Sequence, residues 1–209
     1  MKPLILYTNP NSRGRIVRWM LEELGVPYDV QVMEYGSSIK SPDYLQINPM
    51  GKVPAIKHGE MVVTECAAIC AYLADQFSDK GLAPAPGGAA RGAYYRWLFF
   101  AAGPLEMAMS AKSCGWRIDD DNVQSIGCGY LDDVLNTLEQ AIQQSPYLCG
   151  EQFTAADLYV GSHLGWGMMF KSIEERPVFK DYVQRLYSRE AAIRANQLDD
   201  ELQKQQAMA

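Results

Sequence analysis

The chain has 209 residues, a length that suits one large or two small domains. Its composition, 48% hydrophobic and 21% charged, is typical of a globular protein and excludes a mainly disordered one. A net charge of −6 argues against nucleic acid or an anionic membrane surface as the main partner. No apolar run approaches the roughly 18 residues that span a bilayer, and the start is too short for a signal peptide, so we expect a cytoplasmic protein.

The first 80 residues mix short strand and helix patterns. The patterns predict strands at 4–7, 28–32, 53–56 and 61–63, and helices at 12–24, 41–47 and 64–77. Gly25 and Pro27 end the first helix, Ser41 and Pro42 open the second, and 58–60 forms a hairpin turn. The predicted order is therefore β-α-β-α-β-β-α.

Strand signals disappear after residue 80. A proline- and glycine-rich linker at 81–88 precedes helical patterns at 89–112, 122–144, 153 onward, 177–187 and 191–202, with a kink at Gly103-Pro104 and a frayed or loose end after Gln197. The predicted domains are an α/β domain at 1–80 and an all-helical domain at 89–209.

The cysteines and histidines predict neither a disulfide framework nor a metal site. The five cysteines are an odd number without a CxxC pair, and His58 and His163 are far apart. Cys66 and Cys70 are more typical of core-lining thiols, and His163 of a packed or hydrogen-bonded histidine. Asp157, three residues after Thr154, completes a capping box, so we interpret it as structural.

Three segments of the first half carry candidate binding residues. Ser12 at the start of the first helix is either a helix cap or a hydroxyl that donates to an anion. Pro54 opens a strand; a cis Val53–Pro54 bond can leave a short free edge for a peptide-like ligand, whereas an ordinary edge proline has no partner. Glu65 either compensates a helix dipole or pairs with an ammonium group, while the adjacent N–H groups hold a carboxylate.

These pieces, in this order, resemble the cytosolic glutathione transferase family, particularly its bacterial members. The matching segments cover nearly the whole chain: 13–25, ending in Leu-Glu-Glu-Leu-Gly, Asn48-Pro-Met-Gly-Lys-Val-Pro54, Thr64-Glu65 with the helix after it, and Phe153-Thr-Ala-Ala-Asp157. The resemblance implies a thioredoxin-like α/β N-terminal domain plus an all-α C-terminal bundle, in a two-fold homodimer that takes glutathione as co-substrate and needs no metal.

The resemblance also implies roles for individual residues. Val53 and Pro54 pair with the cysteinyl backbone of glutathione, Glu65 and Cys66 hold its γ-glutamyl end, and Lys40 and Lys52 are candidates for its glycyl carboxylate. Cys66 departs from the family's usual serine, which makes it a weaker donor.

The residue that contacts the thiolate is open between Ser12, which we favour because a hydroxyl rotates to suit, and Asn11, with Asn9 as a further possibility. Tyr7 ends the first strand as a catalytic tyrosine does in other classes, but such a tyrosine is also commonly structural.

The helical half is expected to bind a small hydrophobic electrophile. Its wall is predicted from apolar residues that serve equally well as core: Pro104, Met107, Met109, Trp116, Trp166 and Met169. The implied activity is detoxifying conjugation of the electrophile, with peroxides or disulfides as further substrates. The alternative is a non-catalytic binding or regulatory protein on the same fold. A cysteine-based reductase is disfavoured because no cysteine precedes Cys66.

Overall fold

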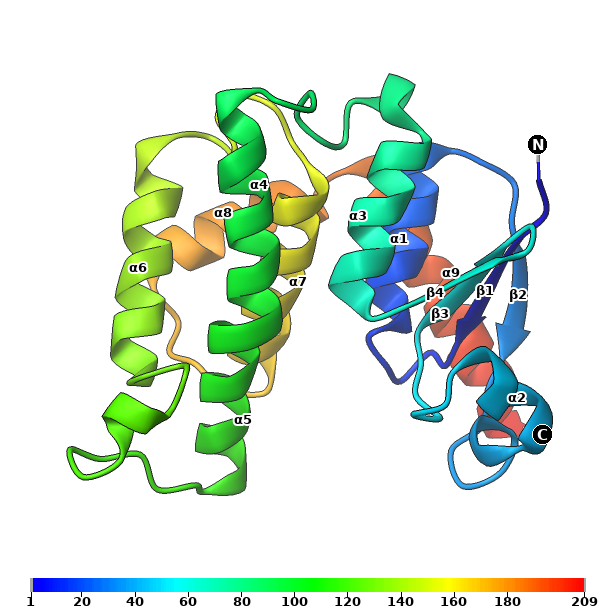
Figure 1. Cartoon of the computed structure of the whole chain (residues 1–209), viewed down its shortest axis with the longest axis horizontal. Helices are drawn as coiled ribbons and strands as arrows, with labels where there is room; N and C mark the ends of the chain where they lie inside the picture. Colours follow the sequence, from blue (N-terminus) through cyan, green and yellow to red (C-terminus); the bar gives the residue numbers. More distant parts are fainter. Residues whose placement is uncertain (1, 209) are drawn as a thin grey trace. The chain divides into compact units, whose positions relative to one another are not determined.

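The computed structural model describes residues 2–208, which form two compact units (Figure 1). The first unit contains the residues up to Lys80 together with those from Ser188 onward, and the second is Gly81–Tyr187. The first is an α/β unit and the second is helical, as the sequence predicts.

A four-stranded sheet in the order β2-β1-β3-β4 forms the centre of the first unit. The strands are β1 (Leu4–Thr8), β2 (Asp29–Val32), β3 (Ala55–His58) and β4 (Met61–Thr64). Strand β1 runs parallel to β2 and antiparallel to β3, and β3 pairs with β4 across the hairpin turn. The register places Ala55 opposite both Tyr7 and Thr64, so the C-terminal ends of β1 and β4 meet the start of β3 at one edge.

Helices α1 (Gly14–Leu24), α2 (Pro42–Ile47) and α3 (Cys66–Gln76) complete the predicted β-α-β-α-β-β-α order. Gly25 ends α1 in the left-handed conformation, with φ 62°, and the Ser41 hydroxyl accepts from the Tyr44 N–H at the start of α2. Short 3₁₀ turns lie at η1 (Ser38–Lys40) and η2 (Ser78–Lys80). A small second core of Met33, Ile39 and Tyr44 with Tyr7, Ile47 and Val53 packs beside α2.

The C-terminal helix α9 (Glu190–Met208) corrects two expectations. Residues 89–209 do not form one helical domain, because α9 packs along α1 in the first unit. Its end is not a loose tail either, since the helix continues to Met208. A buried ion pair explains the packing: Arg18 Nε on α1 donates to Asp199 Oδ1 on α9 at 2.8 Å, with 5% and 0% of the two side chains exposed.

The second unit is built from helices α4 (Ala89–Phe100), α5 (Glu106–Cys114), α6 (Leu131–Gln144), α7 (Ala155–Met169) and α8 (Pro177–Tyr187). Between α4 and α5 the chain forms a π-helical turn, η3 (Ala101–Leu105), where Gly103-Pro104 predicts a kink. Helix α7 is buried over most of its length and packs against α4 and α8.

Two sequence expectations for this unit have different outcomes. The predicted helix at 122–144 is too long, because 123–125 form a 3₁₀ turn (η4, Val123–Ser125) and α6 starts only at Leu131, after Gly127 and Gly129. The structural interpretation of Asp157 is confirmed: it is fully buried and completes the capping box with Thr154 at the start of α7. Within residues 2–208, no helix is both long and apolar enough to cross a membrane.

Candidate functional site

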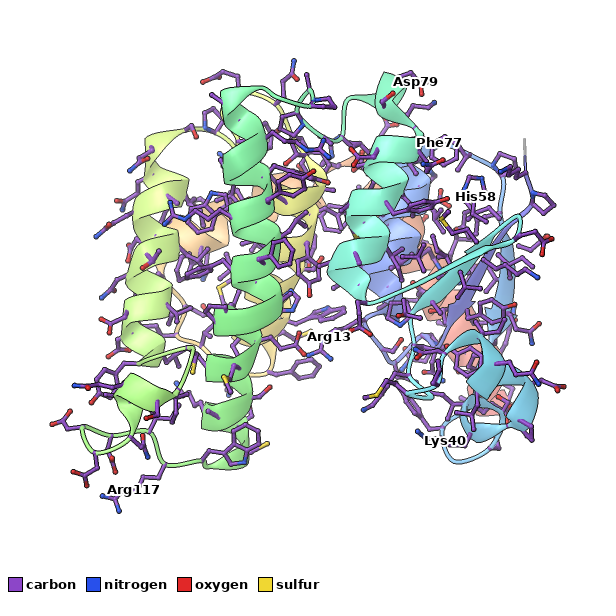
Figure 2. The ribbon with its side chains drawn as sticks, in the orientation of Figure 1. Arg13, Lys40, His58, Phe77, Asp79 and Arg117 are labelled. Carbon is purple, nitrogen blue, oxygen red and sulfur yellow. The ribbon has the colours of Figure 1, made fainter. Side chains whose placement is uncertain are left out.

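One edge of the first unit gathers most of the predicted binding residues. Because Ala55 pairs with Thr64, extending the register places Pro54 next to Glu65. The start of α3 also lies beside the start of α1, since Cys66 Sγ is 3.8 Å from the Arg13 carbonyl oxygen (Figure 2 labels Arg13). The strand ends therefore bring three segments together at one end of the sheet, which is this edge of the first unit: residues 11–13, 53–54 and 65–66.

The loop that leads to Val53 is held by hydrogen bonds to a single carbonyl. The Lys52 carbonyl oxygen accepts from the Tyr44 hydroxyl at 2.6 Å and from the Asn48 side-chain amide at 2.9 Å. The Val53–Pro54 peptide bond is cis. Among residues 2–208 the backbone N–H and C=O of Val53 have no hydrogen-bond partner, so they are available to an extended peptide-like ligand.

Glu65 combines a strained backbone with an unpaired carboxylate. It precedes α3 with φ 65° and ψ 117°, a conformation that a non-glycine residue rarely adopts and that costs about 1–3 kcal/mol. Its side chain is exposed and has no ion pair or hydrogen bond within the described chain. The first N–H groups of α3 have no carbonyl partner inside the helix. The end of β4 therefore offers a carboxylate for a cation beside N–H donors for an anion.

The two candidate lysines differ in their availability. Lys40 Nζ, at the end of η1, donates to the Met50 carbonyl at 2.9 Å, so it stabilises the loop before Val53 (Figure 2). The Lys52 side chain is exposed and forms no ion pair or hydrogen bond within the described part of the chain. Lys52 is therefore the freer cation of the two.

The loop between β1 and α1 contains the candidate thiolate donors. Ser12 Oγ donates to the Asn9 carbonyl at 2.6 Å and accepts from the Gly14 N–H at 2.9 Å, so its single proton is already used. Helix α1 begins at Gly14 with Arg13 as its N-cap, so Ser12 precedes the helix instead of starting it. Gly14 is required here, because a Cβ would lie 1.9 Å from Thr8 Oγ1.

Asn9 and Asn11 have different environments in this loop. Asn9 is buried. Its Nδ2 donates to the Met33 carbonyl at 2.8 Å and its Oδ1 accepts from the Asn11 N–H at 2.9 Å, so its side chain stabilises the loop. Asn11 is exposed, and its Oδ1 accepts from Gln203 Nε2 at 2.7 Å. The Asn11 amide N–H₂ has no partner among residues 2–208, so it is a free donor. Tyr7 packs against Tyr44 with ring centroids 5.6 Å apart.

The second unit has a shallow hollow at the π-helical turn. Its volume is about 460 Å³, and its lining includes the predicted Pro104 and Met107 together with Glu106, Ala102, Gly103 and Gly127. The other four predicted wall residues do not line it. Met109 approaches Gly167 of α7, Trp166 is half-buried, and Trp116 and Met169 are exposed.

Glu106 is a residue of this hollow that sequence reasoning missed. His163 is buried, its Nδ1 lies 2.9 Å from the Tyr159 carbonyl oxygen, and its Nε2 lies 3.6 Å from Glu106 Oε2. Since a carbonyl only accepts, Nδ1 carries a proton. The prediction of a packed or hydrogen-bonded histidine at 163 is confirmed, since both hold. The sequence does mark Glu106 as unusual, because it is the single charged residue between positions 97 and 111.

The described chain contains no cluster of three His, Cys, Asp or Glu residues arranged to hold a metal ion. What the first unit presents is a set of complements to a short charged peptide. These are an unpaired peptide group at Val53, a carboxylate at Glu65 beside a helix start, a cation at Lys52 and an amide donor at Asn11.

Comparisons with known proteins place the chain among related sequences. Residues 2–75 match the family model described as glutathione S-transferase, N-terminal domain, and residues 121–190 match glutathione S-transferase, C-terminal domain. Among similar curated proteins, glutathione S-transferase 3 of Zea mays is 29% identical over 166 residues, covering 75% of this chain and 75% of that protein. A glutathione S-transferase-like protein of Aspergillus aculeatus is 32% identical, covering 69% of this chain and 71% of that protein.

Solved structures give the same result. A glutathione transferase of Methylococcus capsulatus has a TM-score of 0.78 at 27% identity, with 94% of this chain and 98% of that chain covered. The theta class glutathione S-transferase of Xanthomonas axonopodis pv. citri, solved with glutathione bound, has a TM-score of 0.74 at 27% identity, with 93% of this chain and 97% of that chain covered.

Proposed function

Because this chain belongs to the glutathione transferase family, we propose that it binds glutathione at the edge formed by Val53, Glu65 and Asn11. We further propose that it lowers the pKa of the glutathione thiol and joins the glutathione, through its sulfur, to small hydrophobic electrophiles. The observation that carries the proposal is the unpaired Val53 peptide group next to the unpaired Glu65 carboxylate. A free peptide group and a free carboxylate at one sheet edge suit a zwitterionic peptide.

Each part of glutathione has a partner at this edge. The Val53 N–H and C=O pair with the cysteinyl backbone, as a short added strand does. The Glu65 carboxylate pairs with the γ-glutamyl ammonium, and the N–H groups at the start of α3 hold the γ-glutamyl carboxylate. Lys52 attracts the glycyl carboxylate, while Lys40 supports the loop.

The chemical step requires a thiolate. A free thiol has a pKa of about 8.5, and lowering it by about two units takes roughly 2.7 kcal/mol of preferential stabilisation of the anion. A hydrogen bond to a charged group contributes about 1.5–3 kcal/mol, so one good donor supplies most of this. The thiol proton goes to solvent, the sulfur attacks the electrophilic carbon, and the leaving group departs with the electrons of its bond.

We propose Asn11, instead of Ser12, as the donor to the thiolate. The single Ser12 proton is held by the Asn9 carbonyl at 2.6 Å, and a bond to a thiolate requires that contact to break. The Asn11 N–H₂ needs no such exchange, because it has no partner in the described chain. Ser12 then supports the loop, and Asn11 contacts the sulfur.

We propose that the electrophile binds at the hollow of Pro104 and Met107, where apolar and flexible side chains accept varied shapes. Conjugation, reduction of peroxides and reduction of disulfides all begin with the same thiolate, so we leave the electrophile at the level of a small hydrophobic class. We also propose a homodimer. In the aromatic-rich stretch 94–97 of α4, Tyr94 and Trp97 are buried core residues, so we propose that the contact uses Tyr95 and Phe99, the exposed large apolar residues of this helix.

Binding and turnover of the purified wild-type protein test this proposal. We expect retention on immobilised glutathione and turnover with at least one member of a panel of aryl halides, peroxides and disulfides. Glu65→Gln removes the charge at the edge, and Glu60→Gln, at the exposed hairpin turn, is the matched control. Binding without turnover would favour the non-catalytic alternative, and equal binding by the Glu65 variant and the wild type would reject the edge as the site.

A further inference from the structure

The C-terminal helix α9 contacts the loop that contains the proposed thiolate donor. Asp199 and Asp200 of α9 hold Arg18 and Arg15 of α1 at 2.8 Å and 2.7 Å. Gln203 lies four residues after Asp199, on the same helical face. These ion pairs fix the position of Gln203 relative to the start of α1. Its Nε2 there donates to Asn11 Oδ1, in the loop before the helix, at 2.7 Å.

Asn11 is held at its backbone as well as at its side chain. Its N–H donates to Asn9 Oδ1 at 2.9 Å, and its carbonyl accepts from the Tyr35 hydroxyl at 3.4 Å. The backbone contacts locate the residue, but they leave the amide free to rotate. The bond from Gln203 is therefore the contact that decides which way the amide faces.

We propose that Gln203 is a positioning residue for activation of the glutathione thiol. By donating to Asn11 Oδ1 it leaves the N–H₂ group to donate to the sulfur. Turning the Asn11 amide over would bring N–H₂ against the Gln203 donor, so Gln203 would have to turn as well. This inference rests on the proposed function and adds that α9, outside the thioredoxin-like chain segment, orients the donor.

Two substitutions of Gln203 separate orientation from mere contact. Gln203→Ala removes the bond and lets the Asn11 amide rotate. Gln203→Glu has nearly the same shape, but its carboxylate only accepts, so it draws the Asn11 N–H₂ toward itself and turns Oδ1 to the sulfur. The matched controls are Gln205→Ala and Gln205→Glu, because Gln205 is exposed on the same helix and has no partner among residues 2–208.

The measurement is the ultraviolet absorbance of the thiolate of bound glutathione against pH, with KM and kcat beside it. We expect Gln203→Ala to raise the thiol pKa by about half to one unit, as loss of one neutral hydrogen bond predicts. Gln203→Glu should raise the pKa further, and both Gln205 variants should match the wild type. The KM for glutathione should stay constant, and kcat should recover at higher pH.

Added to Asn11→Ala, the Gln203→Ala change should have no further effect, because both variants act on one donor. A wild-type protein that binds and activates glutathione, with a raised pKa in Asn11→Ala but an unchanged pKa in the Gln203 variants, overturns this inference and leaves the proposed function standing. An unchanged pKa in Asn11→Ala overturns this inference together with the assignment of Asn11 as the thiolate donor, while glutathione binding and activation by the protein stand. A wild-type protein that does not lower the thiol pKa overturns both.

Discussion

Replacing Asp157 with alanine should be among the most damaging single changes in the second unit. The carboxylate is fully buried and accepts four hydrogen bonds. Oδ1 accepts from the Leu148 N–H at 2.7 Å and the Tyr182 hydroxyl at 2.8 Å. Oδ2 accepts from the N–H and the hydroxyl of Thr154 at 2.9 Å and 2.8 Å. Asp157→Ala leaves these four donors without their acceptor.

The magnitude follows from which donors find new partners. The Thr154 hydroxyl can rotate, whereas the two backbone N–H groups and the buried Tyr182 hydroxyl cannot move far. At about 1–3 kcal/mol for each orphaned buried donor, three of them cost roughly 3–9 kcal/mol. Alanine also removes the buried carboxylate itself, whose pKa is raised because burial disfavours its charged form. We therefore expect a loss in the lower part of this range, about 3–5 kcal/mol.

Related variants divide this loss into parts. Asp157→Asn keeps an oxygen for Leu148 and Tyr182 but presents N–H₂ to the Thr154 N–H, so we expect an intermediate loss of about 1.5–3 kcal/mol. Tyr182→Phe removes one bond and should cost about 1 kcal/mol. Asp181→Ala, an exposed carboxylate on the same helix as Tyr182, should stay within about 0.5 kcal/mol of the wild type.

Urea unfolding followed by tryptophan fluorescence and by circular dichroism measures these differences. Coincident curves are needed first, because two units can unfold separately. An Asp157→Ala protein within 1 kcal/mol of the wild type, or one no worse than Asp157→Asn, would refute the reasoning.

Three further predictions concern binding, pH and assembly. Glu65→Ala should weaken glutathione binding by about 1.5–3 kcal/mol, the range for a charged hydrogen bond; calorimetry showing equal affinity would reject the pairing. The pKa of Tyr28 is raised to about 12 by burial and a bond to Glu22, and burial raises that of Tyr44 to about 12. Since unfolded tyrosine titrates near pH 10, the unfolded state loses these protons first. Stability should therefore fall as pH rises from about 10 to 12, and a Tyr28→Phe protein with the same alkaline slope would contradict this. Sedimentation at micromolar concentration should show a dimer that Phe99→Asp weakens; a monomeric wild type would exclude the dimer.

The elements of the first unit could be predicted from the sequence because local residues mark where its helices start and end. Gly25 ends α1 and Ser41 starts α2, as local patterns predict. The place of α9 was not readable, because Arg18 and Asp199 are 181 positions apart and nothing local marks them as a pair. The same holds for Gln203, whose partner Asn11 lies 192 positions earlier.

A sequence motif indicates which residues are candidates for the site. It does not show which of their donors and acceptors already have partners within the fold. Spacing draws attention to Ser12 as a hydroxyl before a helix, but it cannot show that the Asn9 carbonyl already holds its proton. Residue type alone cannot separate the hollow at Pro104 from the surface at Trp116, because the sequence does not show which apolar side chains line a hollow and which are simply exposed.

The return of α9 to the first unit has a consequence for synthesis on the ribosome. A chain emerges from its N-terminus, and domains generally fold as units in that order. Here the sheet and α1 emerge long before Asp199. The Arg18 guanidinium therefore has no ion-pair partner from α9 while the second unit is synthesised. During that interval the face of α1 that α9 covers stays open to chaperones and to α9 segments of neighbouring nascent chains. Translation speed through residues 81–187 thus sets how long the first unit remains unfinished.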